Sequence, residues 1–301
     1  MFFSIPGNEV FTQKLATRMG AEIGKIEIRP FPDGESYVRV LSVVKSKNIV
    51  LVCTLNEPNE KLLPLYFLSK TLKQKGAEYV CLAAPYLAYM RQDKAFKPGE
   101  SITSNYFAEI ISSCVDSLLT VDPHLHRRSS LNEIYTIPSE VLHAANHISE
   151  WIGCNVENPV IIGPDGESDQ WVRDVARNTK APFTVLQKER KGDRDVSVSV
   201  PHLEKYRDRT PVIVDDIIST AGTMIATVKH LEDLGMSAPI CIGVHPVFAA
   251  NAFQDLLNAG VERIVTCNTI PHISNDIDVS DLFTAVLEQT TPSRGSIPPN
   301  K

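Results

Sequence analysis

Short apolar runs alternate with longer amphipathic segments along almost the whole chain. The apolar runs are rich in Val, Ile and Leu, and strands are expected at Phe2–Ile5, Ile23–Ile28, Tyr37–Leu41, Ile49–Thr54, Tyr79–Ala83, Ser117–Val121, Val160–Ile162, Phe183–Leu186, Val212–Val214, Ile240–Val244 and Arg263–Thr266. Helical spacing of apolar residues predicts helices at Glu9–Met19, Leu62–Lys75, Ile102–Cys114, Ser139–Trp151, Ser168–Asn178, Thr223–Leu234, Ala250–Ala259 and Val279–Glu288. This alternation favours an α/β fold with parallel sheets and helices on both faces.

Turn-forming residues divide these segments at consistent places. Pro32-Asp33-Gly34 lies between two strand-like runs and predicts the turn of an antiparallel hairpin. Gly76, Gly235 and Gly260 each follow a helical pattern, where a glycine is expected to cap the helix end.

The two halves of the chain have similar patterns, and 301 residues suit two α/β domains. The break is expected near Ala144, which gives an N-terminal domain over residues 1–143 and a C-terminal domain over residues 144–288. Residues 289–301 are rich in Pro, Ser and Thr and are expected to form a flexible tail.

Composition and charge exclude several classes of protein. The net charge is −6 and the basic residues are scattered, which argues against a nucleic-acid or membrane-surface partner. No apolar run approaches the roughly 20 residues that span a bilayer, and the N-terminal residues lack the basic region of a signal peptide. The six cysteines form no CxxC pair, and most lie in apolar runs, as expected of a reduced cytoplasmic protein.

The stretch Pro211–Met224, PVIVDDIISTAGTM, carries the clearest chemistry. An apolar run ends in Asp215 and Asp216, and the small polar run Ser219–Thr223 precedes a helical pattern. Backbone N–H groups, hydroxyls and the start of a helix can hold a phosphate, while the two carboxylates can accept hydrogen bonds from sugar hydroxyls or hold a metal. The alternative is a plain strand-to-helix turn, but the acid pair beside the polar run favours a phosphorylated sugar.

The sequence DDIISTAGT resembles the phosphoribosyl-pyrophosphate loop of type I phosphoribosyltransferases and of ribose-phosphate pyrophosphokinases. The other segments favour the second family, because they occur in its order: FPDGE at Phe31–Glu35, YMRQDKAFKPGESIT at Tyr89–Thr103, TVDPHLH at Thr120–His126, PDG at Pro164–Gly166 and QKER at Gln187–Arg190. The resemblance extends from about Phe3 to Leu287 and so covers essentially the whole chain.

Membership of that family would imply two domains of the phosphoribosyltransferase-like fold. It would also imply transfer of the diphosphoryl group of ATP to ribose 5-phosphate, with Mg²⁺ as cofactor. In that case Asp215 and Asp216 would hold the ribose hydroxyls or a second ion, and the loop made of Ser219, Thr220, Ala221, Gly222 and Thr223 would hold the 5-phosphate.

The resemblance assigns ATP contacts to Arg91, Gln92 and Asp93, which follow an apolar run and a turn. An arginine can bind phosphate with two parallel hydrogen bonds, and Gln92 could read an adenine edge. Without the resemblance, a solvated charged loop would be the better interpretation.

Phe31, Asp33 and Glu35 surround the predicted hairpin turn. Phe31 could stack on a purine, and a carboxylate could accept from the purine amino group. In the family this hairpin completes the adenine pocket of a neighbouring subunit, which implies a homo-oligomer.

His124 and Asp165, each after an apolar strand-like run, are the candidate metal ligands. Mg²⁺ prefers oxygen ligands and binds through nucleotide phosphates, so few protein ligands are needed. His126 is interpreted as a surface loop residue, since no further Cys or His cluster supports a zinc site. Glu167 and Ser168 depart from the family pattern after Asp165, and a simple helix N-cap at Asp165 or Ser168 is an alternative.

Lys188 and Arg190 lead into the charged segment KERKGDRD. The segment could be an exposed hairpin, or a flap that brings positive charge over the transferring phosphates. The two interpretations are compatible. In the family this lysine and arginine are catalytic.

Two other functions share part of this pattern. A phosphoribosyltransferase would keep Asp215–Thr223 without needing the Arg91–Thr103 segment, and a regulatory homologue would lose metal or flap residues. Ser219 stands where bacterial and animal forms carry aspartate, which resembles archaeal-type enzymes, so dimer, tetramer and hexamer all stay open.

Overall fold

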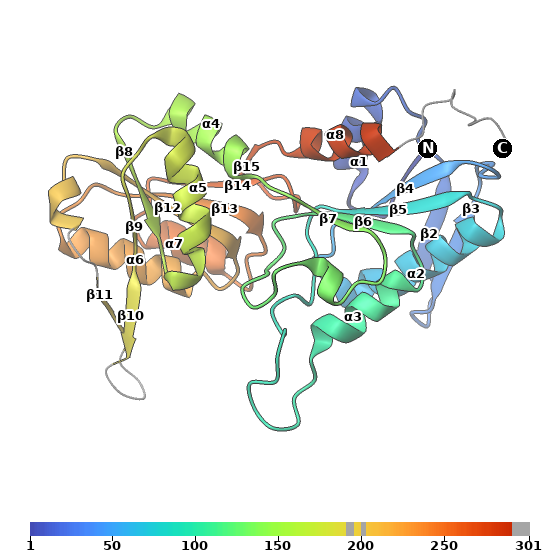
Figure 1. Ribbon diagram of the computed structural model, residues 1–301, viewed down its shortest axis with the longest axis horizontal. Helices are drawn as coiled ribbons and strands as arrows, with labels where there is room; N and C mark the ends of the chain where they lie inside the picture. Colours follow the sequence, from blue (N-terminus) through green and yellow to red (C-terminus); the bar gives the residue numbers. More distant parts are fainter. Residues whose placement is uncertain (191–195, 200–202, 291–301) are drawn as a thin grey trace, which may run out of the picture. The chain divides into compact units, whose positions relative to one another are not determined.

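The computed structural model describes residues 1–190, 196–199 and 203–290, and it divides the chain into two compact units. The first unit comprises Met1–Thr120, Ser130–Leu142 and the described part of Ser280–Lys301, and the second comprises Val121–Ser129 and His143–Val279. Both units are α/β, each with a mainly parallel sheet and flanking helices, as the alternation predicted (Figure 1). The units interleave along the chain, whereas the expected domains are continuous.

The first unit is built on a five-stranded sheet of order β1-β4-β5-β6-β7. Its strands are β1 (Phe2–Ser4), β4 (Asn48–Val52), β5 (Tyr79–Ala84), β6 (Ser117–Val121) and β7 (Ser139–Leu142), and the first four pair in parallel. In Figure 1, α1 (Glu9–Arg18) and α8 (Ser280–Thr290) lie on one side of this sheet, and α2 (Pro58–Gln74) and α3 (Thr103–Ser112) on the other. Phe11 of α1 meets Phe283 of α8 edge to face, with 5.5 Å between ring centroids.

A separate antiparallel ribbon, β2 (Ile26–Pro30) and β3 (Ser36–Val40), confirms the predicted hairpin. Gly34 in its turn has φ +92°, a conformation that glycine adopts without steric cost. The glycines predicted to cap helices, Gly76, Gly235 and Gly260, also have positive φ.

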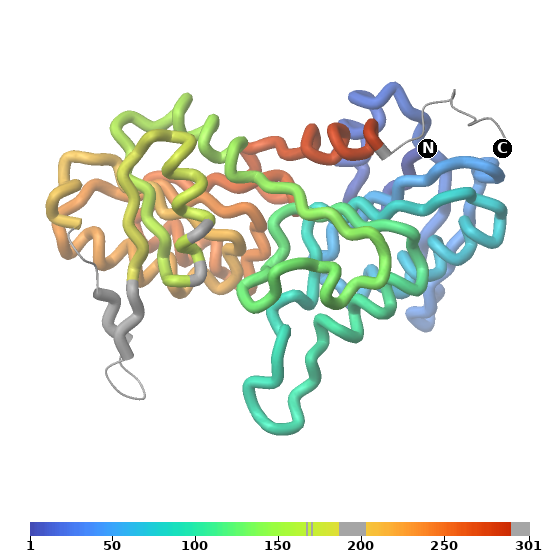
Figure 2. The backbone as a smooth tube through the Cα atoms, in the orientation of Figure 1, coloured from blue at the N-terminus to red at the C-terminus, as the bar shows by residue number. Residues whose placement is uncertain are grey.

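The second unit contains a six-stranded sheet of order β15-β14-β13-β12-β8-β9, parallel throughout. Its strands are β8 (Pro159–Gly163), β9 (Phe183–Val185), β12 (Thr210–Ile218), β13 (Ile240–Pro246), β14 (Arg263–Cys267) and β15 (Asn275–Ile277). The helices that flank it in the described part of the unit are α4 (Ala145–Asn155), α5 (Asp169–Thr179), α6 (Gly222–Asp233) and α7 (Ala252–Asn258). Helix α4 packs against α5 and α6 against α7, and the path of the chain through these helices can be followed in Figure 2. Strands β10 (Gln187–Arg190) and β11 (Val196–Ser199) pair as an antiparallel ribbon.

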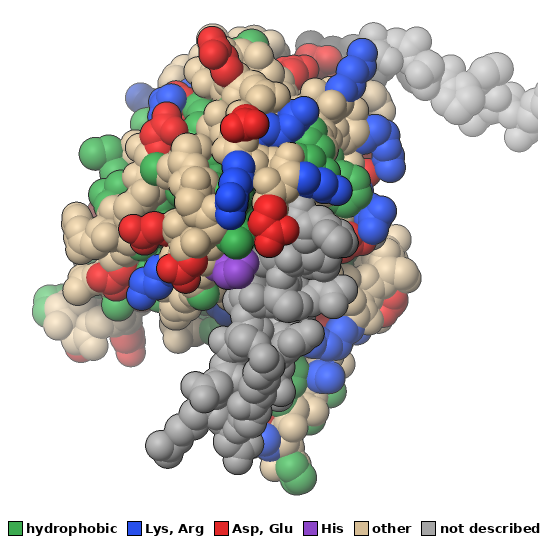
Figure 3. Space-filling model, turned by 90° about the vertical axis from the view of Figure 1, so that its left-hand side faces the viewer, with side chains coloured by type: hydrophobic (Ala, Val, Ile, Leu, Met, Phe, Trp, Pro, Cys, Tyr) green, Lys and Arg blue, Asp and Glu red, His purple; other side chains and the backbone are tan. Residues whose placement is uncertain are grey.

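A core of aliphatic side chains fixes β12 against α6. Ile213 and Ile218 of β12 pack with Val228 and Leu231 of α6, and all four are almost completely buried. On the surface the two signs of charge are mixed, as the described part of the face in Figure 3 shows. No helix within the described ranges has the length and apolarity needed to cross a membrane.

Two elements differ from the expected ones in ways that matter for the site. The helix predicted from Ser139 begins instead at Ala145, because residues 139–142 form β7 at the edge of the first sheet. Strand β12 continues past Val214 to Ile218, with Asp215 opposite Gly243 and Ile217 opposite His245 of β13. Asp215 and Asp216 therefore lie within a strand and are held by its pairing.

Candidate active site

The predicted phosphate loop lies between β12 and α6, within the second unit. Ala221 has φ +58° at the residue before the helix, and α6 begins at Gly222. The N–H groups of Phe248 and Ala249 donate to the carbonyls of Ile218 and Ser219, which ties the loop to the segment after β13. The loop therefore presents the positive end of a 12-residue helix beside an exposed Thr220, an arrangement suited to a phosphate group.

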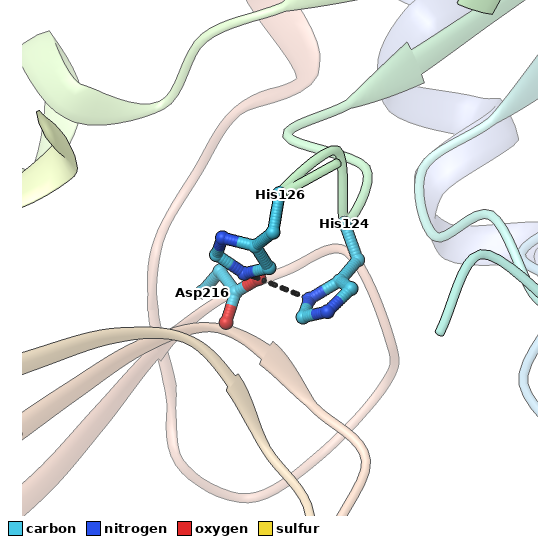
Figure 4. A group of neighbouring side chains, drawn as sticks. All are labelled: His124, His126 and Asp216. Carbon is cyan, nitrogen blue, oxygen red and sulfur yellow. Dashed lines mark hydrogen bonds and ion pairs between the residues drawn. The ribbon is translucent and has the colours of Figure 1, made fainter. Parts of the chain in front are cut away.

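Asp216 points toward two histidines on the loop that follows β6 (Figure 4). His124 Nδ1 lies 3.0 Å from Asp216 Oδ2, and His126 Nε2 lies 3.6 Å from the same oxygen. The two imidazole rings meet edge to face at 3.9 Å between centroids. All three residues belong to the second unit, so this contact lies within a single unit.

His126 is exposed as a whole residue on this loop, as predicted, but the interpretation did not include a contact for its imidazole. Its side chain is 23% exposed and faces Asp216 across from His124. The spacing HxH directly after a strand was the sequence signal that could have identified it. The three side chains form a group in which one ligand atom from each lies within 4.8 Å of the others.

The two aspartates have opposite shifts in pKa. Burial alone would raise the pKa of the Asp216 carboxyl, but hydrogen bonds from His124 and His126 and their positive charge outweigh it, so the pKa is lowered. Burial raises the pKa of Asp215, and the neighbouring charges of Asp216 and Asp165 raise it further. Asp216 is therefore the more acidic member of the pair, and Asp215 holds a proton more tightly than an ordinary aspartic acid does.

A network around Asp122 fixes the loop that carries the histidines. The Asp122 carboxylate accepts hydrogen bonds from His143 Nδ1 and from the backbone N–H of Ala144, each at 2.8 Å. His245 Nε2, from the end of β13, lies 3.2 Å from the Asp122 carbonyl oxygen. These partners hold Asp122 at φ +32°, a conformation that costs a non-glycine residue energy. Sequence reasoning missed this network, although Asp122 and His245 both end strand-like runs.

His143 is expected to stabilise the fold in a pH-dependent way. The hydrogen bond to Asp122 raises the pKa of the His143 imidazole above its usual 6.5. The stability it contributes is fully present below that value and lost as pH rises through the raised pKa. Since the side chain is 72% exposed, the expected loss in His143→Ala is only about 0.2–1 kcal/mol at pH 6, falling toward zero at about pH 9.

Denaturant unfolding of the wild-type protein and His143→Ala at both pH values measures this difference. The matched control repeats the comparison in an Asp122→Asn background, where the pH dependence should vanish. A difference that does not change with pH would show that His143 acts by packing alone.

Asp165, the other predicted metal ligand, lies two residues beyond β8. Its carbonyl oxygen accepts hydrogen bonds from the backbone N–H and the hydroxyl of Ser168, at 3.2 and 2.7 Å. Its charge affects Asp215, but among the described residues the metal-ligating group contains Asp216 and not Asp165. Of the two predicted ligands, His124 therefore belongs to this group and Asp165 does not.

The residues predicted to contact ATP lie in the first unit. Phe31 at the tip of the β2–β3 ribbon is 39% exposed and meets Tyr37 edge to face, with the Arg29 guanidinium within about 5 Å of both rings. Asp33 Oδ1 accepts from the backbone N–H of Glu35. The hairpin therefore carries an accessible aromatic ring, as a base-stacking site requires.

Arg91, Gln92 and Asp93 follow β5 in a loop braced by Glu100. Glu100 Oε2 accepts from the backbone N–H groups of Phe96 and Lys97, which lowers the pKa of its carboxyl, and it lies 3.4 Å from Gln92 Nε2. Asp93 is buried and Arg91 exposed. Lys188 and Arg190 belong to β10, and their side chains lie outside the part of the chain that the structure describes.

Comparison with known proteins identifies the family. Residues 1–114 match the N-terminal domain of ribose phosphate pyrophosphokinase, and residues 130–284 match the phosphoribosyl transferase domain. The ribose-phosphate pyrophosphokinase of Sulfurisphaera tokodaii is 32% identical over 91% of this chain and 94% of its own length. That of Methanothermobacter thermautotrophicus is 31% identical over 96% of this chain and 100% of its own.

The fold agrees with this assignment. The crystal structure of phosphoribosylpyrophosphate synthetase from Mycobacterium smegmatis superposes with a TM-score of 0.85 at 22% identity, covering 96% of this chain and 97% of that one. The family-model matches, the full-length relatives and the resemblance in the motifs therefore agree that the chain belongs to the ribose-phosphate pyrophosphokinase family.

Proposed function

We propose that this protein transfers the diphosphoryl group of ATP to the C1 hydroxyl of ribose 5-phosphate, giving phosphoribosyl pyrophosphate and AMP. The observation that carries the proposal is the acid pair Asp215–Asp216 held in β12, a few residues before the start of α6. Carboxylates that accept from hydroxyls, next to N–H groups that bind phosphate, match the two ends of a ribose 5-phosphate molecule. Family membership supplies the donor, ATP.

The acceptor half of the site is proposed to lie wholly in the second unit. Ser219, Thr220 and the N–H groups of Ala221, Gly222 and Thr223 would bind the 5-phosphate. Asp215 and Asp216 would hold the ribose hydroxyls, with the pKa of Asp215 raised and the Asp216 carboxylate accepting from a hydroxyl. This arrangement orients the C1 hydroxyl toward the donor without a strong general base.

The donor half is proposed to consist of Arg91, Gln92 and Asp93 for the nucleotide, with Phe31, Asp33 and Glu35 of a neighbouring subunit around the adenine. The exposed ring of Phe31 supports this use, since a hairpin tip that carries an ordered aromatic side chain can enter a partner's pocket. A homo-oligomer in the cytoplasm is the assembly and location that we propose.

The reaction forms one bond between the C1 oxygen and the β-phosphorus and breaks the bond between that phosphorus and the oxygen bridging to AMP. Lys188 and Arg190 would neutralise the charge that develops, and alignment would supply much of the rate. Mg²⁺, when bound to the ATP phosphates, would reduce their negative charge. Of the two predicted ligands, the Asp165 carboxylate fits Mg²⁺ because it offers oxygen, whereas the His124 nitrogen fits it less well.

Incubation with ATP, Mg²⁺ and ribose 5-phosphate tests the proposal. We expect AMP and phosphoribosyl pyrophosphate in equal amounts, with Asp215→Asn as a variant of matched shape that lowers the rate. Release of pyrophosphate from phosphoribosyl pyrophosphate and a base, without AMP formation from ATP, would indicate a phosphoribosyltransferase instead. No turnover in either assay would favour a regulatory homologue.

A further inference from the structure

We infer that His124, His126 and Asp216 form a site for one transition-metal ion that the protein binds by itself, before any nucleotide, and that this site discriminates against Mg²⁺. The inference goes beyond the proposed function, because it concerns the protein without substrates. It rests on three side chains of the second unit alone.

The first support is the convergence of the ligand atoms. His124 Nδ1 and His126 Nε2 lie 3.0 and 3.6 Å from one carboxylate oxygen, Asp216 Oδ2. Bonds of about 2.0–2.2 Å to a tetrahedral or octahedral ion place neighbouring ligand atoms roughly 3–3.5 Å apart. The two separations from Asp216 Oδ2 therefore match those around an ion, and all three ligand atoms lie within 4.8 Å of one another.

The second support is the kind of ligand. Two imidazole nitrogens and one carboxylate oxygen suit Co²⁺, Zn²⁺ and other divalent transition metals, which bind nitrogen well. Mg²⁺ takes oxygen ligands and keeps most of its waters, so this set fits it poorly. Mg²⁺ fits this site poorly because His126 adds a second nitrogen ligand to that of His124.

The third support is that each ligand is already held in place. Asp216 Oδ1 accepts from the backbone N–H of Ile217 at 2.7 Å, which leaves Oδ2 directed toward the imidazoles. The loop that carries both histidines is anchored through Asp122, whose carboxylate accepts from His143 and Ala144 and whose carbonyl oxygen faces His245. Such outer partners orient ligands and raise metal affinity.

The competing explanation is that the three side chains form a hydrogen-bonded latch that holds no ion. A latch needs one bond, and His124 at 3.0 Å supplies it. His126 Nε2, 3.6 Å from the same oxygen, is a second imidazole nitrogen at the carboxylate and completes a set of three ligands. The two explanations differ in what the isolated protein binds.

Calorimetric titration of the protein, freed of metals by a chelator, with CoCl₂, ZnCl₂ or MgCl₂ alone tests the inference. We expect one Co²⁺ or Zn²⁺ per chain, visible absorption bands of histidine-bound Co²⁺, and no Mg²⁺ binding in the same concentration range. His126→Ala and the isosteric Asp216→Asn should each lose at least about tenfold in Co²⁺ affinity, the lower end of the effect of outer-shell changes. His230→Ala, on α6, serves as the matched histidine control and should bind as the wild type does.

Three results would overturn the inference: no Co²⁺ or Zn²⁺ binding by the wild type, unchanged affinity in both His126→Ala and Asp216→Asn, or equal affinity for Mg²⁺. Circular dichroism of each variant shows whether it is folded, and Asp216→Asn keeps the test open should His126→Ala not fold. If the protein forms AMP but binds no metal in the absence of nucleotide, this inference is wrong and the proposed function stands. Metal binding without AMP formation would instead contradict only the proposed function.

Discussion

Thr220→Asp is expected to weaken the binding of ribose 5-phosphate by roughly 100-fold or more. Thr220 is exposed in the loop before α6, beside the N–H groups proposed to hold the 5-phosphate. Two unit charges about 4 Å apart repel by about 1 kcal/mol in water and about 4 kcal/mol near a protein surface. A 100-fold loss corresponds to about 2.7 kcal/mol, which lies between these limits for a single carboxylate facing a phosphate.

The matched control is Thr220→Asn, which has nearly the same shape as Asp but no charge. Titration calorimetry with ribose 5-phosphate should show a small loss for Thr220→Asn and the large loss only for Thr220→Asp. ATP affinity and the unfolding midpoint should be unchanged in both, since the side chain is exposed. Equal losses would mean that the loop is sensitive to shape alone, and unchanged binding in Thr220→Asp would place the phosphate elsewhere.

The loop could be predicted from the sequence because everything that defines it is local. The apolar run before Asp215, the small residues Ser219–Thr223 and the following helical pattern lie within a few residues of one another. Hydrophobic alternation likewise predicted both parallel sheets, because buried strands and amphipathic helices each have a local pattern. The hairpin turn at Pro32-Asp33-Gly34 was equally local.

The features that could not be predicted depend on residues far apart in the chain. His124 and Asp216 are 92 positions apart, so His126 beside them gave no local sign of its partner. His245 reaches the Asp122 carbonyl oxygen from 123 positions away. Residues 139–142 have an apolar pattern that continues into a helix, and only their pairing at the edge of the first sheet makes them β7.

The length of β12 is the non-local feature with the greatest effect on the site. Pairing with β13 carries the strand through Asp215 and Asp216 to Ile218, and at this end Ile218 crosses over Gly243 of β13. A Cβ atom at position 243 would lie 2.6 Å from Ile218 Cγ1 and 2.7 Å from Ile218 Cδ1, both closer than real contacts allow. Glycine at 243 is therefore what lets β12 reach the phosphate loop with its last residue buried.

Gly243→Ala is accordingly expected to destabilise the protein by about 1–3 kcal/mol, the usual cost of overpacking a close-packed core. Ile218 is β-branched and almost fully buried, so it has little freedom to turn aside. Denaturant unfolding of the variant measures the loss. Gly153→Ala in α4 is the matched control, because a Cβ there meets nothing within 4 Å and alanine favours a helix.

A double-mutant cycle shows whether the clash with Ile218 is the cause. Ile218→Ala alone should cost about 2–5 kcal/mol through the cavity it leaves. If the two side chains compete for one space, Gly243→Ala should add much less in the Ile218→Ala background than it costs alone. Strict additivity would place the strain at another neighbour of Gly243. Because Ile218 precedes Ser219 directly, the variant should also bind ribose 5-phosphate more weakly even where it remains folded, which the calorimetric titration would detect.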